Sequence, residues 1–192
     1  MPFDFSTPFA IFVQCIGFAA MAFGIGSYQA KRRGSIIFIQ VAGSLLWSAQ
    51  FILLGQWTGA ILNVLAILRG LCYVTKGKWN PRMHLWMPIL FSLAFLAAGV
   101  LTVPGLFSGT VETGALLLSL LPVLAMVLSS FGLSLAEENK IRAVCFFASP
   151  PWMIYDLLSG SVAGVINEAF VMVSIAVGLA RYRNRGKKQD ES

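Results

Sequence analysis

Charged residues are scarce in this sequence. Only 11% of its 192 residues are Asp, Glu, Lys or Arg, while 57% are hydrophobic and the mean hydropathy is +0.78. An average soluble domain carries about 25% charged residues. So few charges could not cover a soluble protein of this length, whereas a lipid bilayer removes that need. The scarcity of charge therefore predicts an integral membrane protein, and the length allows a single compact bundle.

Residues that carry catalysis or bind metals are equally few. The three cysteines, Cys15, Cys72 and Cys145, lie in apolar stretches without a C-x-x-C pair, and we interpret them as packing residues. The only histidine, His84, has no cluster of carboxylates or thiols around it. The chain also lacks an H-E-x-x-H motif, a Walker loop, a dinucleotide fingerprint and a Ser–His–Asp order. We therefore expect no enzyme activity, no metal site and no cofactor.

The chain shows no motif for nucleic acid and no pattern of a cleaved leader. Its net charge is +6, but Lys and Arg gathered in cytoplasmic loops make most membrane proteins basic, and no base-stacking motif accompanies them. The early residues have no basic region before the apolar run, and Asp4 is their only charge. We expect a retained first helix with its N-terminus outside, a lipid bilayer as the main partner and no nucleic acid.

Seven apolar segments are present instead. Each is about 17–21 residues long, roughly what a helix needs to cross the hydrocarbon core. The predicted spans are Pro8–Tyr28, Ile36–Leu54, Thr58–Thr75, His84–Thr102, Thr113–Leu133, Ile141–Leu158 and Val162–Arg181.

The connections between these segments alternate in charge. The second, fourth and sixth contain no Lys or Arg, whereas thirteen of the fourteen basic residues lie in or beside the others and in the tail. The positive-inside rule places the basic connections and the C-terminus in the cytoplasm. The thirteen are Lys31, Arg32 and Arg33; Lys76, Lys78 and Arg82; Lys140 and Arg142; and Arg181, Arg183, Arg185, Lys187 and Lys188.

The first three segments resemble the last three. A shift of 105 residues places Trp47 on Trp152, Gly55 on Gly160 and Gly59 on Gly164. We therefore predict an all-α membrane protein built of two parallel three-helix repeats joined by a linker helix, a 3+1+3 plan. The boundaries are 1–82 for the first repeat, 83–112 for the linker helix, 113–182 for the second repeat and 183–192 for a basic cytoplasmic tail.

Parallel repeats are one way to build a transporter, and the solute site then lies between them. Helices softened by Gly or Pro at matching positions are the usual pointer to such a site, because they expose backbone groups. Gly17 falls on Pro122 under the same shift, and Pro150 with Pro151 interrupts the sixth segment. We predict that these four residues act as hinges.

Polar side chains inside the membrane are the first candidates for the site. An ionised group at mid-bilayer costs about 3 kcal/mol on insertion scales, so such residues face the bundle interior. Glu168 lies about two turns into the last segment and falls on Asn63 under the shift. It either binds a cation, a proton or a polar solute, or forms a packing hydrogen bond to Asn63 or Asn167. Arg69 either pairs with Glu168 or extends toward the inner face.

The sixth segment adds an aromatic and acidic face. Trp152, Tyr155 and Asp156 share one side of a helix, and Trp47 and Gln50 occupy equivalent positions in the second segment. They either line a solute site or form an interfacial aromatic belt. The complete set of predicted substrate-binding residues is Trp47, Gln50, Asn63, Arg69, Trp152, Tyr155, Asp156, Asn167 and Glu168.

Short motifs along most of the chain resemble one family. They include Ser27-Tyr28-Gln29, the run Phe51–Gly55 followed by Thr58-Gly59, and later Tyr155-Asp156, Gly160-Ser161, Ser174, Gly178 and Arg181-Tyr182. With these motifs the chain resembles the YgjV-type bacterial inner membrane proteins, a likeness that implies the bacterial inner membrane but no particular activity. More distantly, the 3+1+3 plan is similar to the PQ-loop carriers, including the SWEET and PnuC types, although no Pro-Gln pair occurs here.

Two functional hypotheses follow from these patterns. The first is a transporter of a small polar solute that works by alternating access. The second is a non-transporting receptor, assembly factor or partner subunit, whose bundle would be packed solid between the repeats. A homo-oligomer is compatible with either.

Overall fold

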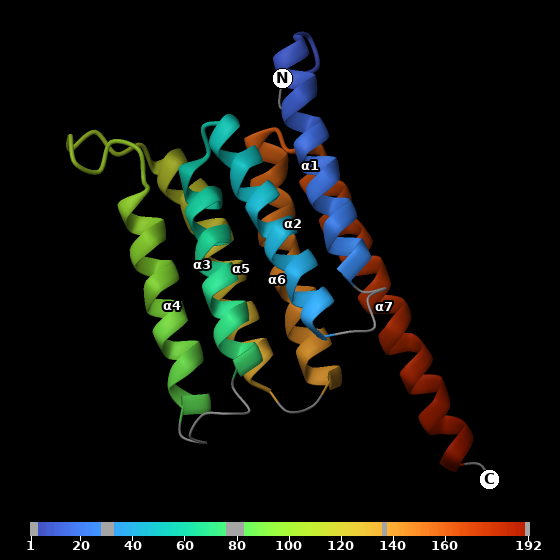
Figure 1. Cartoon of the computed structure of the whole chain (residues 1–192). Coiled ribbons are helices and arrows are strands. Elements are labelled where there is room, and N and C mark those ends of the chain that lie inside the picture. Colours follow the sequence, from blue (N-terminus) through green and yellow to red (C-terminus); the bar gives the residue numbers. More distant parts are fainter. Residues whose placement is uncertain (1–3, 28–32, 76–82, 136–137, 191–192) are drawn as a thin grey trace.

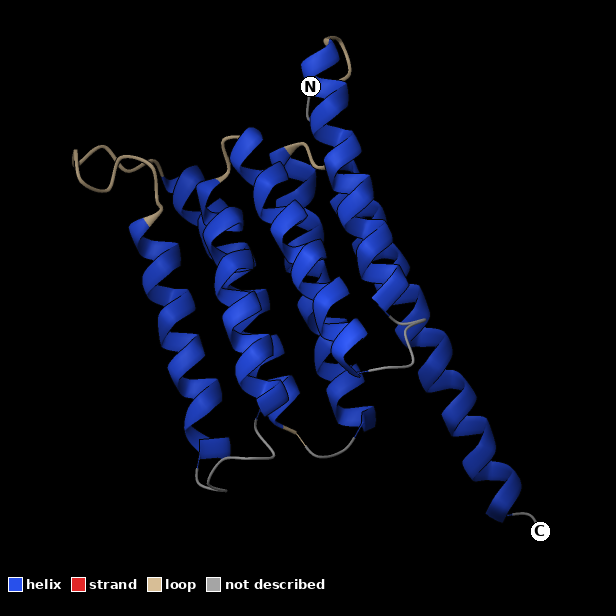
Figure 2. Ribbon diagram, in the orientation of Figure 1, coloured by secondary structure: helices blue, strands red, loops and turns tan. Residues whose placement is uncertain are grey.

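The computed structural model is all-helical, as the sequence predicts. It describes residues 4–27, 33–75, 83–135 and 138–190, and within these ranges it contains helices and connections but no strand. The helices are α1 (Pro8–Ser27), α2 (Arg33–Leu53), α3 (Trp57–Thr75), α4 (Met83–Leu101), α5 (Thr113–Ser134), α6 (Glu138–Ser159) and α7 (Val162–Asp190). Figure 2 shows the same seven helices and the loops that join them.

Most helix ends lie within three residues of the predicted ends, but α7 does not. We expected the helix to end at Arg181 and to be followed by a tail, whereas α7 continues to Asp190. This segment is rich in Arg, Lys and Gln, whose long unbranched side chains favour the helix. The helix therefore extends through most of the predicted basic tail.

Six of the helices form a closed ring. Each helix in the order α1, α2, α3, α5, α6, α7 contacts the next, and α7 contacts α1. The fourth helix, α4, lies outside the ring against α3 and α5 (Figure 1). The N-terminus and the α2–α3, α4–α5 and α6–α7 connections lie at one end of the bundle, and α7 ends at the opposite end.

The two shortest connections have the same backbone structure. Gly55 and Gly160 have φ values of 73° and 78°, a conformation that side-chain-bearing residues rarely adopt. The amide of Gln56 donates to the carbonyl of Phe51 at 2.7 Å, and that of Ser161 donates to the carbonyl of Asp156 at 2.9 Å. Both are Schellman-type helix ends, in which glycine allows the chain to reverse direction within two or three residues.

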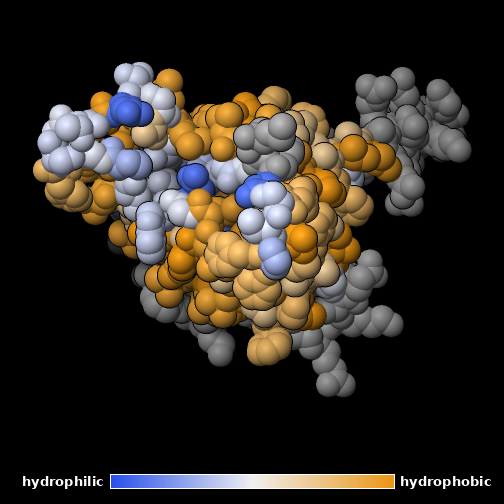
Figure 3. Space-filling view, turned by 90° about the horizontal axis from the view of Figure 1, so that it is seen from above, coloured by the Kyte–Doolittle hydropathy of each residue, from blue (hydrophilic) through white to orange (hydrophobic). Residues whose placement is uncertain are grey.

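Large apolar side chains cover the outside of the bundle. Leu90, Leu93, Phe147 and Val173 are all more than half exposed. By length and composition alone, Pro8–Gly26 in α1 and Thr113–Gly132 in α5 are long and apolar enough to cross a membrane, and shorter apolar stretches lie in α2, α3, α4 and α7. Figure 3, which looks onto the end with the short connections, shows hydrophobic surface over much of this face and hydrophilic residues at its left edge and centre.

The interior contains two apolar clusters. One joins α3, α4 and α5 through Leu62, Phe95 and Val123. The other joins α2, α3 and α6 through Phe51, Ala60 and Tyr155, with both Trp47 and Trp152 packed against it. The second cluster forms one wall of the site described next.

Candidate functional site

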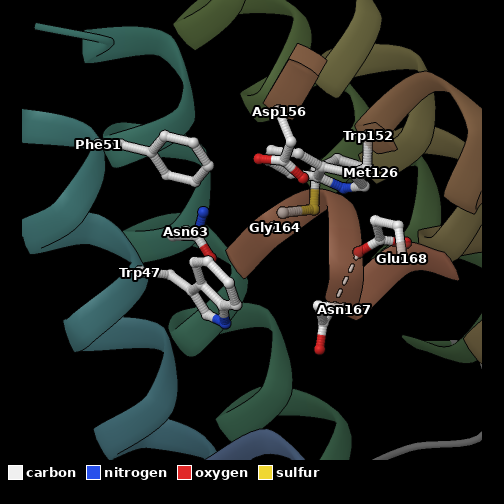
Figure 4. A pocket seen from close by; sticks show the side chains of 9 residues that line it. All are labelled: Trp47, Phe51, Asn63, Met126, Trp152, Asp156, Gly164, Asn167 and Glu168. Atoms are coloured by element: carbon white, nitrogen blue, oxygen red, sulfur yellow. Dashed lines mark hydrogen bonds between the residues drawn. The ribbon is translucent and has the colours of Figure 1, made fainter. Parts of the chain in front are cut away.

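A cavity of about 130 Å³ lies inside the helix ring. Its walls come from α2 and α3 on one side and α6 and α7 on the other, with one residue from α5 (Figure 4). It is lined by Trp47, Phe51, Asn63, Met126, Trp152, Asp156, Gly164, Asn167 and Glu168.

Six of the nine predicted substrate-binding residues line this cavity. They are Trp47, Asn63, Trp152, Asp156, Asn167 and Glu168. Gln50 and Tyr155 lie behind the wall as fully buried side chains, and Arg69 lies on another part of α3. Whether the six bind a solute stays a prediction.

Glu168 is held by its neighbours on α6 and α7. The amide of Asn167 donates to the Glu168 carboxyl at 3.2 Å, and the buried hydroxyl of Ser149 is a further hydrogen-bond partner of that carboxyl. Asn63, the other partner that we considered, instead donates to the carbonyl of Gly59 at 2.9 Å. Glu168 therefore has a packing hydrogen bond and still faces the cavity.

Asp156 is the most buried acid of the site, with 3% of its surface exposed. Its Oδ1 atom has no hydrogen-bond partner among the described residues. Gly164 on α7 makes room for the carboxyl, because a Cβ atom at that position would overlap it. Buried polar groups normally have partners, so the free Oδ1 is an unusual feature of this wall.

The aromatic rings of Trp47, Phe51 and Trp152 form a row along the wall of the cavity. The ring centroids of Trp47 and Phe51 are 6.3 Å apart, and those of Phe51 and Trp152 are 6.0 Å apart. Tyr155 packs behind them, with its centroid 5.5 Å from that of Phe51. The predicted lining residues Trp47 and Trp152 thus belong to one continuous aromatic cluster that lines the cavity.

Gln50 and Tyr155 connect the two sides of the ring. The hydroxyl of Tyr155 on α6 accepts a hydrogen bond from the amide of Gly59 on α3 at 2.9 Å. From α2, the side-chain oxygen of Gln50 accepts a hydrogen bond from the hydroxyl of Ser161 at 3.2 Å. These two residues position the walls of the cavity and do not line it.

The arginine of α3 bonds to α5. The Nη1 atom of Arg69 donates to the hydroxyls of Ser129 and Ser130 at 2.7 and 2.9 Å and to the carbonyl of Met126 at 3.1 Å. Its guanidinium also lies over the ring of Phe95, 5.3 Å from the centroid. These contacts are with α5 and not with Glu168, and they attach α3 to α5 below the cavity wall. Extension of Arg69 toward the inner face stays a prediction.

The four predicted hinges lie within helices. Pro122 is inside α5, and Pro150 and Pro151 are inside α6. Gly17 on α1 leaves room for the side-chain amide of Gln50 on α2. Their role as hinges stays a prediction.

Three lining residues were not predicted from the sequence. Phe51 falls on Asp156 under the 105-residue shift, and Gly164 lies one helical turn before Glu168, so both could have been found from the repeat. Met126 carried no such signal, because nothing distinguishes it from other apolar residues of α5.

The described part of the chain contains no group of three or more His, Cys, Asp or Glu side chains that could hold a metal ion. The lining consists of two carboxyl groups, two amides, three aromatic rings, Met126 and Gly164.

Comparison with known families identifies the chain at the family level. Residues 11–186 match the model of the Imp-YgjV family, described as a bacterial inner membrane protein. The chain belongs to this family. The resemblance drawn from the short motifs is thereby confirmed, and with it the assignment to the bacterial inner membrane. No curated protein and no solved structure matches the chain significantly, and the more distant likeness to PQ-loop carriers stays a prediction.

Proposed function

We propose that this chain is a multi-pass carrier that moves a small solute across the bacterial inner membrane, with its N-terminus outside and its C-terminus in the cytoplasm. The solute would bind in the cavity between two parallel three-helix repeats. We further propose that the protein catalyses no reaction, since its sequence contains none of the catalytic or metal-binding motifs named above.

The distribution of polarity supports membrane crossing. Exposed side chains along the helices are largely Leu, Phe, Ile and Val, while Gln50, Asp156 and Ser161 are buried inside the ring. A soluble protein shows the reverse arrangement. Thirteen of the fourteen Lys and Arg residues lie in or beside the first, third and fifth connections or in the last part of α7, which supports a cytoplasmic location for the end of the bundle at which α7 ends.

The contacts between helices support the repeat. If the two halves are repeats, then α1, α2 and α3 correspond to α5, α6 and α7. Exchanging the two halves converts the contact of α1 with α7 into a contact of α5 with α3, and both contacts exist. The two glycine turns at Gly55 and Gly160 correspond under the same exchange. In this arrangement α4 is the linker, because it lies outside the ring.

The observation that carries the proposal is the composition of the cavity wall. Three pairs of lining residues are related by the 105-residue shift: Trp47 with Trp152, Phe51 with Asp156, and Asn63 with Glu168. The cavity therefore lies where an axis relating the two halves would pass. Carriers built from parallel repeats bind their solutes at this interface, which opens to each side of the membrane in turn.

Cysteine accessibility tests alternating access without knowledge of the solute. Asn167→Cys, in a chain whose natural Cys15, Cys72 and Cys145 are replaced by Ala, is treated with a membrane-impermeant thiol reagent in right-side-out and in inside-out vesicles. We expect reaction from both sides. Ile166→Cys is the matched control, because Ile166 is 45% exposed on the outside of α7 and would face lipid; it should react in neither preparation.

The second candidate function is a non-transporting membrane receptor or subunit. The hydrogen bonds of Ser149 and Asn167 to Glu168 favour it, since they give this acid a structural role. It predicts that Asn167→Cys is protected on both sides, or reacts from one side only. Either result would remove the carrier proposal.

A further inference from the structure

The cavity has an unbalanced charge. Asp156 and Glu168 both line it, and their carboxyl groups are close enough to interact electrostatically. The other polar lining residues are the neutral amides Asn63 and Asn167, so no described lining residue is basic. Two acids that share a small space favour a positively charged occupant, because ionised carboxylates buried in a protein need a partner.

Asp156 is poised to accept such an occupant. Its Oδ1 is buried without a hydrogen-bond partner among the described residues, and Figure 4 shows the carboxyl directed into the cavity. A side chain at position 164 would overlap this carboxyl, so Gly164 leaves free the space that the carboxyl occupies. Asp156 therefore offers an acceptor that the protein itself leaves unused.

The aromatic wall indicates what kind of cation fits. Trp47, Phe51 and Trp152 form a continuous row of rings with centroids 6.0–6.3 Å apart. Aromatic faces attract cations, and alkylated ammonium groups are bound in proteins by such aromatic cages. A strongly hydrated metal ion gains less from this wall, since it prefers oxygen ligands on several sides.

The volume limits the size of the occupant. A cavity of about 130 Å³ is close to the roughly 150 Å³ in which an engineered protein interior binds benzene. The space therefore fits a molecule of about that size.

From these observations we propose that the cavity binds a small organic cation, of the alkylammonium or guanidinium type. Its charge would lie between Asp156 and Glu168, and its apolar or planar part would lie against Trp47, Phe51 and Trp152. This inference rests on the proposed carrier function and names the class of its substrate.

Paired probes of equal shape and different charge test it. Binding to the full chain in lipid nanodiscs is measured by calorimetry with tetramethylammonium against neutral tert-butanol, and with guanidinium against neutral urea. We expect each cation to bind at least tenfold more tightly than its neutral counterpart. Sodium chloride at the same concentration tests whether a simple inorganic cation binds as tightly as the organic cations.

Charge-removing variants of nearly unchanged shape complete the test. Asp156→Asn and Glu168→Gln should each weaken binding of the cations at least tenfold. Glu112→Gln is the matched control, because it removes the same charge from an exposed position before α5, and it should bind like the unmodified chain. Circular dichroism of each variant verifies that the helices are intact.

The outcomes separate this inference from the function on which it rests. Equal binding of the cations and their neutral counterparts, sodium binding as tight as that of the organic cations, or no effect of Asp156→Asn would overturn the cation site. Reaction of Asn167→Cys from both sides would leave the carrier intact in that case. Cation binding together with protection of Asn167→Cys would keep the cation site and reject the carrier.

Discussion

At the scale of single residues, the site depends on a side chain that is missing. Gly164 permits the Asp156 carboxyl to lie against α7, and no other residue type would leave that space. Glycine at this point has a steric purpose, since α7 is regular there and needs no unusual φ. A substitution at residue 164 should therefore change the position of the Asp156 carboxyl more than it changes the fold.

We expect Gly164→Ala to displace the Asp156 carboxyl and to weaken binding of tetramethylammonium at least tenfold, as measured by calorimetry. The overlap is with the end of a side chain, which can rotate, so most of the helical signal should remain. Gly70→Ala on α3 is the control, because nothing lies within 4 Å of the added methyl group. Unchanged binding by Gly164→Ala would show that the carboxyl does not contact the ligand.

Arg69 illustrates a buried charge with a structural purpose. The hydrogen bonds from its Nη1 atom to α5 include one to the carbonyl of Met126, whose side chain lines the cavity. Hydrogen bonds to charged groups contribute about 1.5–3 kcal/mol each. The residue therefore fixes α3 against α5.

We expect Arg69→Ala to lower the free energy of unfolding by about 3 kcal/mol, because it leaves the Ser129 and Ser130 hydroxyls without this donor. Thermal unfolding in detergent measures the loss. Leu68→Ala is a suitable control, since Leu68 is 51% exposed on the outside of the same helix. A loss no larger than that of the control would contradict a structural role for Arg69.

At the scale of elements, the glycine turns decide how the ring closes. Each turn joins two antiparallel helices with very few residues. Hydrogen bonds near each turn connect that helical hairpin to a further helix of the ring. Gln14 on α1 donates to the carbonyl of Gly160 at 2.7 Å and accepts from the amide of Val162 at 3.2 Å. Thr58 at the start of α3 donates to Ser119 on α5 at 3.2 Å. Polar side chains of α1 and α5 therefore attach these helices to the opposite hairpins.

We expect Gly55→Ala to lower stability by about 1–2 kcal/mol, because alanine is strained at a φ of 73°. Nothing lies within 4 Å of the added methyl group, so the loss measures backbone strain alone. Chemical or thermal unfolding of Gly55→Ala and Gly55→Asn gives the comparison, since asparagine tolerates this conformation better. Equal losses in both variants would point away from backbone strain.

At the scale of the whole molecule, the proposed orientation makes a simple prediction. Phe107 lies in the α4–α5 connection and is 85% exposed, whereas Leu135 follows α5 at the opposite end. In a cysteine-free chain, Phe107→Cys should react with an impermeant thiol reagent in cells with an intact inner membrane. Leu135→Cys should react only after that membrane is opened. The reverse pattern would invert the proposed topology.

The sequence alone determined much of this molecule. The low charge, the seven apolar segments and the basic connections specify an all-helical membrane chain, because lipid requires every backbone group to be bonded within helices or closed sheets. Short motifs identified the family, and six lining residues could be named because polar groups inside a membrane face inward.

Only the tertiary structure decided which of the polar groups meet. Helix periodicity does not tell how helices rotate and pack against each other, so it could not separate Arg69, which bonds to α5, from Asp156 and Glu168, which face the cavity. It also could not reveal the contribution of Met126, since an ordinary apolar side chain carries no signal of its own, and only packing shows that Gly164 makes room for the Asp156 carboxyl. The site is a product of packing between distant segments, and packing is a property of the folded ring.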